Sequence, residues 1–294
     1  DLRRQIQSLA AGRFRQVTDL GYFEACLLGL VQGLTEFLPV SSSGHLVIAQ
    51  RFLGFAGESP EMLLFDVTTH FGTIGAVVVV FMRTFQRYVA RLTRELRPDY
   101  PGKRSAVLVL GLGIAACIPT AAIGLGFKDS FESAFASMRA VGLGLLATGT
   151  LLFVVGRLPR PRRGWRRIGW WRAVIVGVAQ GCAILPGVSR SGSTICAAMA
   201  LGMKRRWAAE FSFFIAVPPI LGAGAIKLMD TMDLPSEQLA AIPWGPIAAG
   251  TLVSFASGAI ALRILLNLVV REKLPHFCYY CWLVGAIVLV WPPS

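Results

Sequence analysis

Residues 31–46 read VQGLTEFLPVSSSGHL, a group of polar side chains within a strongly apolar chain. A glutamine, a glutamate, three serines and a histidine fall between Gln32 and His45, whereas hydrophobic residues make up 54% of the 294 positions. The hydrocarbon core of a bilayer does not tolerate polar groups that lack partners. If the chain spans a membrane, this stretch therefore needs a protein or substrate environment that compensates it.

Long apolar runs follow the stretch and indicate such a membrane protein. Several approach the roughly 20 residues that cross a bilayer as a helix. We expect an all-α polytopic membrane protein. The clearest spanning candidates are 63–82, 105–127, 138–156, 211–229, 240–262 and 277–292.

The net charge of +13 is concentrated in loops beside these runs. Of the 29 lysines and arginines, 20 fall in four short tracts, a distribution typical of the cytoplasmic flanks of membrane helices rather than of a DNA-binding face. We expect membrane lipids as neighbours and no nucleic-acid partner. The positive-inside rule sends 63–82 from outside to inside, and the later spans then alternate. The tracts are 83–104, 157–172, 204–206 and 263–273.

A second polar stretch, AQGCAILPGVSRSGST at 179–194, matches the first at an offset of 148 residues. We interpret the chain as a single membrane domain, 1–294, with two repeats at about 21–156 and 173–292 and a basic cytoplasmic linker at 157–172. The charge rule gives the repeats opposite orientations, which predicts inverted topology. The identical pairs are Gln32 and Gln180, Gly33 and Gly181, Val40 and Val188, Ser41 and Ser189, Ser43 and Ser191, and Gly44 and Gly192.

The segments 21–54 and 173–203 each precede three spans, and we predict that each is a re-entrant helical hairpin. Irregular backbone at membrane depth is allowed where protein or water surrounds it. One hairpin would enter from the outside and one from the inside. The arginines of the N-terminal stretch favour an alternative in which 21–54 crosses the membrane completely; they are Arg3, Arg4, Arg13 and Arg15.

Each predicted hairpin breaks at a proline and restarts at serines, which are good helix N-caps. The N-terminus of a helix presents free N–H groups and attracts phosphate. Arg190 adds a fork of donors suited to phosphate oxygens. An arginine in an otherwise uncharged apolar stretch marks a ligand site.

Gln32 and Glu36 lie four residues apart and share one helical face. Their oxygens suit Mg²⁺ or Ca²⁺ bridging to phosphate, which would explain a carboxylate beside an anion site. A structural ion pair between Glu36 and Arg190 is the alternative. Three residues after Ser42, His45 is placed to deprotonate its hydroxyl or to attack phosphorus itself.

Asp66 and His70 form a further polar pair at spacing four in the predicted span 63–82. They have the spacing of a ligand pair, and equally that of two groups that bond to each other or to the first hairpin.

The stretches LGLVQGLTEFLPVSSSGHL and AQGCAILPGVSRSGST closely resemble the two signature motifs of the undecaprenyl-diphosphate phosphatase family of the bacitracin-resistance type. FSFFIAVPPILGA resembles the helix that follows in that family, and the resemblance covers roughly 21–292. It implies an enzyme of the bacterial inner membrane that removes the terminal phosphate from a C55 isoprenyl diphosphate. This reaction recycles the lipid carrier for cell-wall synthesis and confers bacitracin resistance, and the family places the active site on the periplasmic side.

The resemblance gives the motif positions, and the chemistry of the side chains suggests a role for each. Ser42 assisted by His45 is the expected nucleophile, with His45 itself or a metal-activated water as alternatives. Gln32 departs from members that carry a second glutamate there, which leaves its part in metal binding open. The expected catalytic residues are Glu36, Ser42, His45 and Arg190, the metal ligands Glu36 and Gln32, and the substrate-binding residues Gln32, Ser41, Ser43, Ser189, Ser191 and Thr194.

A lipid-phosphate flippase or anion transporter is the rival interpretation, because inverted repeats with broken helices are a common transporter plan. A transporter needs Arg190 and the helix ends, but Glu36 and His45 beside hydroxyls exceed what binding requires. Small residues spaced by four favour close helix packing, either within the chain or across a homodimer; they are Gly250, Ser254 and Gly258.

Overall fold

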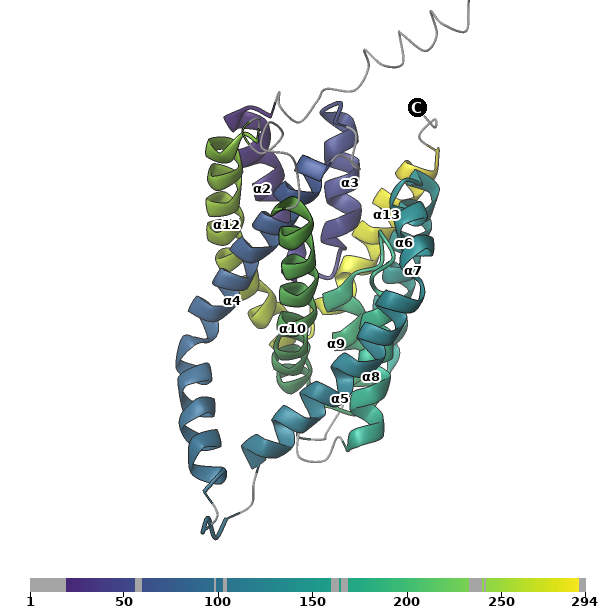
Figure 1. Cartoon of the computed structure of the whole chain (residues 1–294). Coiled ribbons are helices and arrows are strands. Elements are labelled where there is room, and N and C mark those ends of the chain that lie inside the picture. The colour runs from purple at the N-terminus through teal and green to yellow at the C-terminus, as the bar shows by residue number, and fades with distance from the viewer. Residues whose placement is uncertain are drawn as a thin grey trace, which may run out of the picture.

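The computed structural model describes residues 20–55, 60–97, 99–102, 105–159, 164, 169–232, 240 and 242–290. Within these ranges the regular structure is helical and contains no strand, which confirms the all-α prediction (Figure 1). The four N-terminal arginines that favoured a complete crossing by 21–54 lie outside the described residues.

In the described residues, five helices are long and apolar enough to cross a membrane, and they match five of the six predicted spans. The sixth prediction, 277–292, corresponds to α13 (Phe277–Val290), which follows a 3₁₀ turn at Leu274–His276. Leu274–Val290 is a shorter apolar helical segment than the five spans, and positions 291 and 292 of the predicted span lie outside the described residues. The five long helices are α4 (Pro60–Glu95), α5 (Ser105–Gly126), α7 (Met138–Arg157), α10 (Arg205–Met232) and α12 (Trp244–Val270), with α6 (Lys128–Phe135) between α5 and α7.

Two helical hairpins fill the centre of the molecule, where the sequence predicts them. α2 (Tyr22–Phe37) and α3 (Ser42–Phe52) form the first, and α8 (Trp170–Cys182) and α9 (Arg190–Ala200) form the second. In Figure 1 the first hairpin lies in the upper part of the molecule and the second in the lower part. Their turns touch, because a Cβ added to Gly44 would lie 3.0 Å from the Cα of Gly187.

The two turns restart their second helices with the same hydrogen bond. The N–H of Gly44 donates to Oγ of Ser41 at 3.3 Å, and the N–H of Gly192 donates to Oγ of Ser189 at 3.1 Å. The prediction that serines cap both helices is confirmed, and in the second hairpin the cap is Ser189 rather than Ser191. Matched caps are expected of duplicated hairpins; the inverted topology of the repeats stays a prediction.

In each hairpin, the first helix crosses a neighbouring helix at a glycine, and this close contact fixes its position. α2 packs against α12, and α8 packs against α5. A Cβ added to Gly29 would lie 2.1 Å from the carbonyl oxygen of Gly250, and one added to Gly177 would lie 2.0 Å from that of Ala116. Gly29 and Gly177 are 148 residues apart. Backbone meets backbone at both crossings, so neither position has room for a side chain.

The small residues of α12 pack inside this chain. Gly250 lies against α2, and Ser254 Oγ donates to the carbonyl of Thr69 on α4 at 2.9 Å. A Cβ on Gly258 would meet Phe37 and Thr73. The stripe therefore serves the intrachain interface, and it gives no support to a homodimer.

Prolines in α10 shape its contact with the second hairpin. Pro219 has no N–H, so the carbonyl of Ile215 one turn earlier loses its usual helical donor. Gln180 Nε2 donates to this carbonyl at 3.1 Å. A side chain from α8 thus satisfies a backbone group that the proline leaves free.

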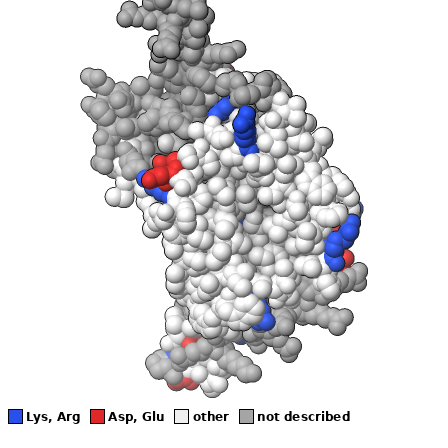
Figure 2. All heavy atoms as spheres, turned by 90° about the vertical axis from the view of Figure 1, so that its right-hand side faces the viewer, with Lys and Arg blue, Asp and Glu red and all other residues white. Residues whose placement is uncertain are grey.

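The outer surface of the long helices is apolar, as a lipid environment requires. Figure 2 shows one face on which charged atoms are sparse and most of the described surface is uncharged. The chain is accordingly a multi-pass membrane protein. Exposed apolar side chains on these helices include Ile118, Leu125, Leu143 and Leu252.

The extension of α4 beyond the apolar span ends in a buried carboxylate. Glu95, which is 0% exposed, accepts hydrogen bonds from the N–H groups of Ala106 and Val107 and from Oγ of Ser105. These are free donors of the first turn of α5. Arg91 Nε donates to the same carboxylate at 2.7 Å, so this group fixes the start of α5 to the end of α4.

Candidate active site

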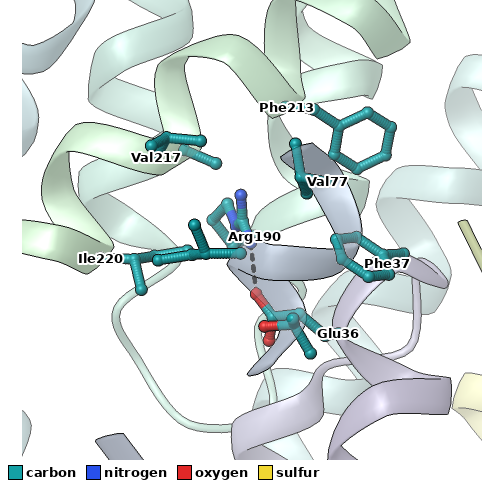
Figure 3. Close-up of a pocket in the computed structure, with 10 residues that line it drawn as sticks. Glu36, Phe37, Val77, Arg190, Phe213, Val217 and Ile220 are labelled. Carbon is teal, nitrogen blue, oxygen red and sulfur yellow. Dashed lines mark hydrogen bonds and ion pairs between the residues drawn. The ribbon is translucent and has the colours of Figure 1, made fainter. Parts of the chain in front are cut away.

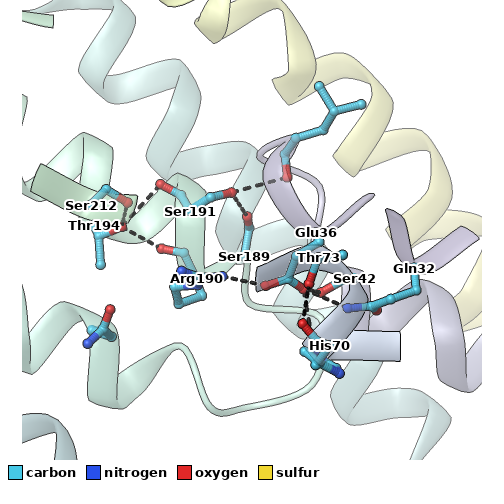
Figure 4. Close-up of polar contacts among 12 residues, drawn as sticks. Gln32, Glu36, Ser42, His70, Thr73, Ser189, Arg190, Ser191, Thr194 and Ser212 are labelled. Carbon is cyan, nitrogen blue, oxygen red and sulfur yellow. Dashed lines mark hydrogen bonds and ion pairs between the residues drawn. The ribbon is translucent and has the colours of Figure 1, made fainter. Parts of the chain in front are cut away.

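A buried carboxylate, Glu36 at the end of α2, collects contacts from both hairpins (Figure 4). One of its oxygens, Oε1, forms an ion pair with Arg190 from α9. The other, Oε2, accepts from Oγ of Ser42 at 2.6 Å and from Nε2 of Gln32 at 3.0 Å. Gln32 and Glu36 share one helical face and are in contact, as their spacing predicts, and Glu36 also forms an ion pair with Arg190.

The turn-to-turn contact explains why these side chains meet. Glu36 stands one residue before the end of α2, while Ser42 and Arg190 are the first residues of α3 and α9. Ser191 Oγ donates to the carbonyl of Leu38 at 3.2 Å and ties the second turn to the first. Side chains from three helices, Gln32 of α2, Ser42 of α3 and Arg190 of α9, thus lie around one carboxylate.

Two polar atoms in this cluster are buried without a hydrogen-bond partner. Among the described residues, Nη1 of Arg190 and Oε1 of Gln32 belong to a set of three such atoms; the third is Oε1 of Gln180. A buried donor or acceptor without a hydrogen bond lowers the free energy of unfolding by about 1–3 kcal/mol, so each such atom needs an explanation. A bound ligand with oxygen atoms and a cation would satisfy the two atoms near Glu36.

A cleft opens at the Glu36–Arg190 pair and has apolar walls (Figure 3). Its cavity volume is about 10 Å³, room for about one water-sized group. The arrangement has a charged end and an apolar body, which suits an amphipathic ligand. The lining residues are Glu36, Phe37, Thr73, Ile74, Val77, Arg190, Phe213, Ala216, Val217 and Ile220.

His45, the expected assistant of Ser42, makes its ring contacts elsewhere. Its Nδ1 lies 2.7 Å from the carbonyl oxygen of Ser41, and its Nε2 lies 2.7 Å from the hydroxyl of Tyr280 on α13. Ser42 Oγ donates to Glu36 instead. A spacing of three residues places Ser42 and His45 on one side of the helix. It cannot predict that Tyr280, which is 235 positions from His45, contacts the His45 ring.

His70 on α4 reaches the site although the expected residue set omits it. Its Nε2 lies 3.6 Å from Oε2 of Glu36, and its Nδ1 lies 2.7 Å from the carbonyl oxygen of Asp66. The sequence feature that pointed to His70 was its spacing of four residues from Asp66. The Asp66 carboxylate accepts from Nε2 of Gln50 on α3 at 2.8 Å, so both side chains contact the first hairpin, which is one of the two alternatives that the spacing allows.

The other expected substrate-binding hydroxyls contact protein groups around the cleft. Thr194 Oγ1 donates to the carbonyl of Arg190 at 2.8 Å and lies 2.5 Å from Oγ of Ser212. Ser189 and Ser191 lie 3.2 Å apart through their Oγ atoms, as Ser41 and Ser43 do at 3.3 Å. These hydroxyls hold the helix starts that carry Ser42 and Arg190.

Sequence comparison gives the family. A family model described as "Bacitracin resistance protein BacA" matches residues 25–287. The chain belongs to the BacA family. The match includes the second hairpin, the first hairpin from residue 25 onward, and the residues in contact with Glu36.

Individual relatives of the BacA chain are similar over nearly their whole length. A protein of Syntrophotalea carbinolica named undecaprenyl-diphosphatase is 43% identical over 268 residues, which cover 91% of this chain and 98% of the relative. Proteins of the same name from Rubrobacter xylanophilus and Carboxydothermus hydrogenoformans are 41% identical over 273 residues and 40% identical over 268 residues. The alignments cover 92% and 91% of this chain and 97% and 96% of those relatives.

The BacA site offers oxygen donors but few formal metal ligands. In the part of the chain that the structure describes, no group of three or more His, Cys, Asp or Glu could hold a metal ion. The oxygens of Glu36, the free Oε1 of Gln32 and Oγ of Ser42 lie together. Mg²⁺ commonly binds through one or two carboxylates, with waters and substrate phosphates as its other ligands, so this donor set fits a cation shared with a phosphate.

Proposed function

We propose that this protein is an integral-membrane phosphatase that hydrolyses undecaprenyl diphosphate to undecaprenyl phosphate and inorganic phosphate. The name shared by the similar BacA proteins supports this substrate. The observation that carries the proposal is the free Nη1 of Arg190, buried beside the Ser42–Glu36 pair at the charged end of an apolar cleft.

The cleft suits both parts of such a substrate. Arg190 would bind the diphosphate with the guanidinium nitrogen that lacks a protein partner, and guanidinium forks match phosphate oxygens. Phe37, Val77 and Phe213 would contact the first isoprenyl units, while the rest of the chain extends into lipid. Binding of phosphate to Arg190 competes with the Glu36 carboxylate and would free Oε1 of Glu36.

Ser42 is the nucleophile in this proposal, and Glu36 rather than His45 accepts its proton. Oγ of Ser42 forms a bond to the terminal phosphorus as the bridging P–O bond breaks, and undecaprenyl phosphate leaves. The proton passes from Oγ to Oε2 of Glu36, at 2.6 Å in the structure. Water then attacks the phosphoserine, Glu36 returns its proton to Oγ, and the second proton of the water is released as phosphate departs.

A divalent cation, Mg²⁺ or Ca²⁺, would be held by Glu36 and Oε1 of Gln32. When bound, it would neutralise part of the charge on the diphosphate, as cations do in phosphoryl transfer. Oε1 of Gln32 is buried without a partner in the described residues, which supports its role as an oxygen ligand.

We place the protein in the bacterial inner membrane with its active site facing the periplasm. There it would regenerate the lipid carrier for peptidoglycan precursors and confer bacitracin resistance. The five long apolar helices support a membrane location, and the description of the matched family supports the link to bacitracin resistance.

Phosphate release by purified protein in detergent tests the proposal, because detergent has no two sides between which a transporter could act. The wild type should release inorganic phosphate from an isoprenyl diphosphate, and Arg190→Ala should lose this activity. Arg206→Ala is the matched control, since this arginine is exposed and pairs with Glu210 on its own helix. An inactive wild type would favour the lipid-phosphate flippase or anion transporter.

A further inference from the structure

The backbone before the proposed nucleophile is strained in one hairpin only. Ser41, the residue before Ser42, has φ 70° and ψ 98°. A residue with a Cβ disfavours positive φ and keeps it only where its surroundings hold it. The matching cap of the second hairpin, Ser189, has φ −72° and ψ 117° and needs no such support.

Ser41 accepts backbone hydrogen bonds from Gly44, at its Oγ, and from His45, at its carbonyl, and a two-step chain of side-chain hydrogen bonds reaches the same carbonyl. A carbonyl oxygen can only accept, so Nδ1 of His45 carries the proton that it donates to Ser41, at 2.7 Å. Nε2 of the neutral imidazole is then an acceptor, and the Tyr280 hydroxyl donates to it at 2.7 Å. The two rings are nearly parallel, at 10°, with centroids 5.6 Å apart. The second hairpin has Ser193 where the first has His45, so it lacks both the strain and its support.

The donor of this chain belongs to a firmly packed helix. α13 packs along α7, where a Cβ on Gly142 would lie 3.1 Å from the carbonyl oxygen of Gly285. Cys281, the neighbour of Tyr280, lies 3.5 Å through Sγ from the carbonyl oxygen of Pro39. α13 therefore contacts the first turn on both sides of Ser41.

We propose that Tyr280 is a positioning residue of the active site, which acts through His45 and Ser41 to direct Oγ of Ser42 at Glu36. This inference rests on the proposed function. Loss of the Tyr280 hydroxyl frees the His45 ring, lets Ser41 relax from positive φ, and turns Oγ of Ser42 away from Oε2 of Glu36. Arg190 and the apolar walls are untouched, so the effect falls on kcat rather than on KM.

Removal of the single hydroxyl is the first test. Tyr280→Phe keeps the ring and should lower kcat for isoprenyl-diphosphate hydrolysis by about fivefold, the size of one neutral hydrogen bond, with KM within about twofold. Tyr279→Phe is the matched control: it removes a hydroxyl from the same helix on an exposed ring that packs against Trp282, and it should leave both constants unchanged.

The Ser41→Gly variant distinguishes a positioning role of Tyr280 from a general loss of structure. Glycine adopts positive φ without support, and as an N-cap it costs little. In the Ser41→Gly background, Tyr280→Phe should change kcat by less than about twofold. An equal loss of kcat in both backgrounds, or no loss with Ser41 present, overturns the proposal.

Thermal unfolding in detergent reports the contact independently of catalysis. Tyr280→Phe should lower the unfolding midpoint when His45 is present and leave it unchanged in the His45→Ala background. Absence of this coupling also overturns the proposal. A wild type that releases no phosphate would remove the proposed function and the catalytic role with it, whereas the unfolding coupling would still show whether the hydroxyl supports His45.

Discussion

Ser42 and Arg190 are the first residues of α3 and α9, stand 148 positions apart, and both contact the carboxylate of Glu36. Equivalent positions of the two hairpins thus supply the proposed nucleophile and the proposed phosphate-binding group. Neither hairpin alone holds both, so the site forms only where the two turns meet.

Glu36→Gln tests the proposed general base while keeping side-chain shape. We expect phosphate release to fall by about 10²–10⁴-fold, the usual contribution of a positioned acid or base. Glu24→Gln on the same helix is the control and should stay within about twofold of wild type. Retention of wild-type activity by Glu36→Gln would remove the carboxylate from the mechanism.

Ser42→Ala separates a serine nucleophile from a water nucleophile. The change removes the hydroxyl that donates to Glu36, and we expect loss of turnover together with loss of a phosphoserine trapped from wild type by acid quench and mapped by mass spectrometry. Turnover that persists without Ser42 would show that water attacks phosphorus directly.

Arg190→Lys keeps the charge but not the planar fork of donors. Lysine cannot contact Glu36 and a phosphate in the same geometry, so kcat/KM for the diphosphate should fall by about 10–100-fold. The exposed Arg206 provides the control as Arg206→Lys. Equal kcat/KM for Arg190→Lys and wild type would argue against phosphate recognition by the fork.

Divalent cation dependence tests the proposed ligand role of Gln32. A chelator should abolish activity, and added Mg²⁺ or Ca²⁺ should restore it. Gln32→Ala should raise the cation concentration for half-maximal activity by about tenfold, because it removes one oxygen ligand. An unchanged cation requirement in Gln32→Ala would assign this residue to orienting Glu36 alone.

Glu95→Ala should lower stability without touching the site. It leaves the first N–H groups of α5 without their buried acceptor, at a cost of about 1–3 kcal/mol in the free energy of unfolding. Unfolding in detergent measures this loss. Glu132→Ala is the control, since its exposed pair with Lys128 contributes at most about 1 kcal/mol.

The sequence allows prediction of those features that local chemistry decides. Proline at 39 and 186 followed by serine predicts the hairpin turns and their caps, and the spacing of Gln32 and Glu36 predicts their contact. The apolar runs predict the long helices, and five of six predicted spans are confirmed, although α4 continues into the charged tract as far as Glu95.

Features that depend on distant partners could not be predicted in this way. His45 Nε2 contacts the Tyr280 hydroxyl on α13, and His70 approaches Glu36 from α4, which packs beside the first hairpin. Helical spacing predicts the side of a helix on which a residue lies, but it does not predict which residue of another helix its side chain contacts. α13 begins at Phe277, where the predicted span 277–292 begins, and positions 291 and 292 lie outside the described residues.

The two matched glutamines, Gln32 and Gln180, have different contacts. Gln180 stands where the offset places the counterpart of Gln32, yet its amide satisfies the Ile215 carbonyl that Pro219 leaves free. Ile184 occupies the position that corresponds to Glu36, so the second hairpin has no acid there. The hairpin is present twice, but Glu36, Ser42 and Arg190 form a single site between the two copies. Each chain would therefore process one lipid molecule at a time.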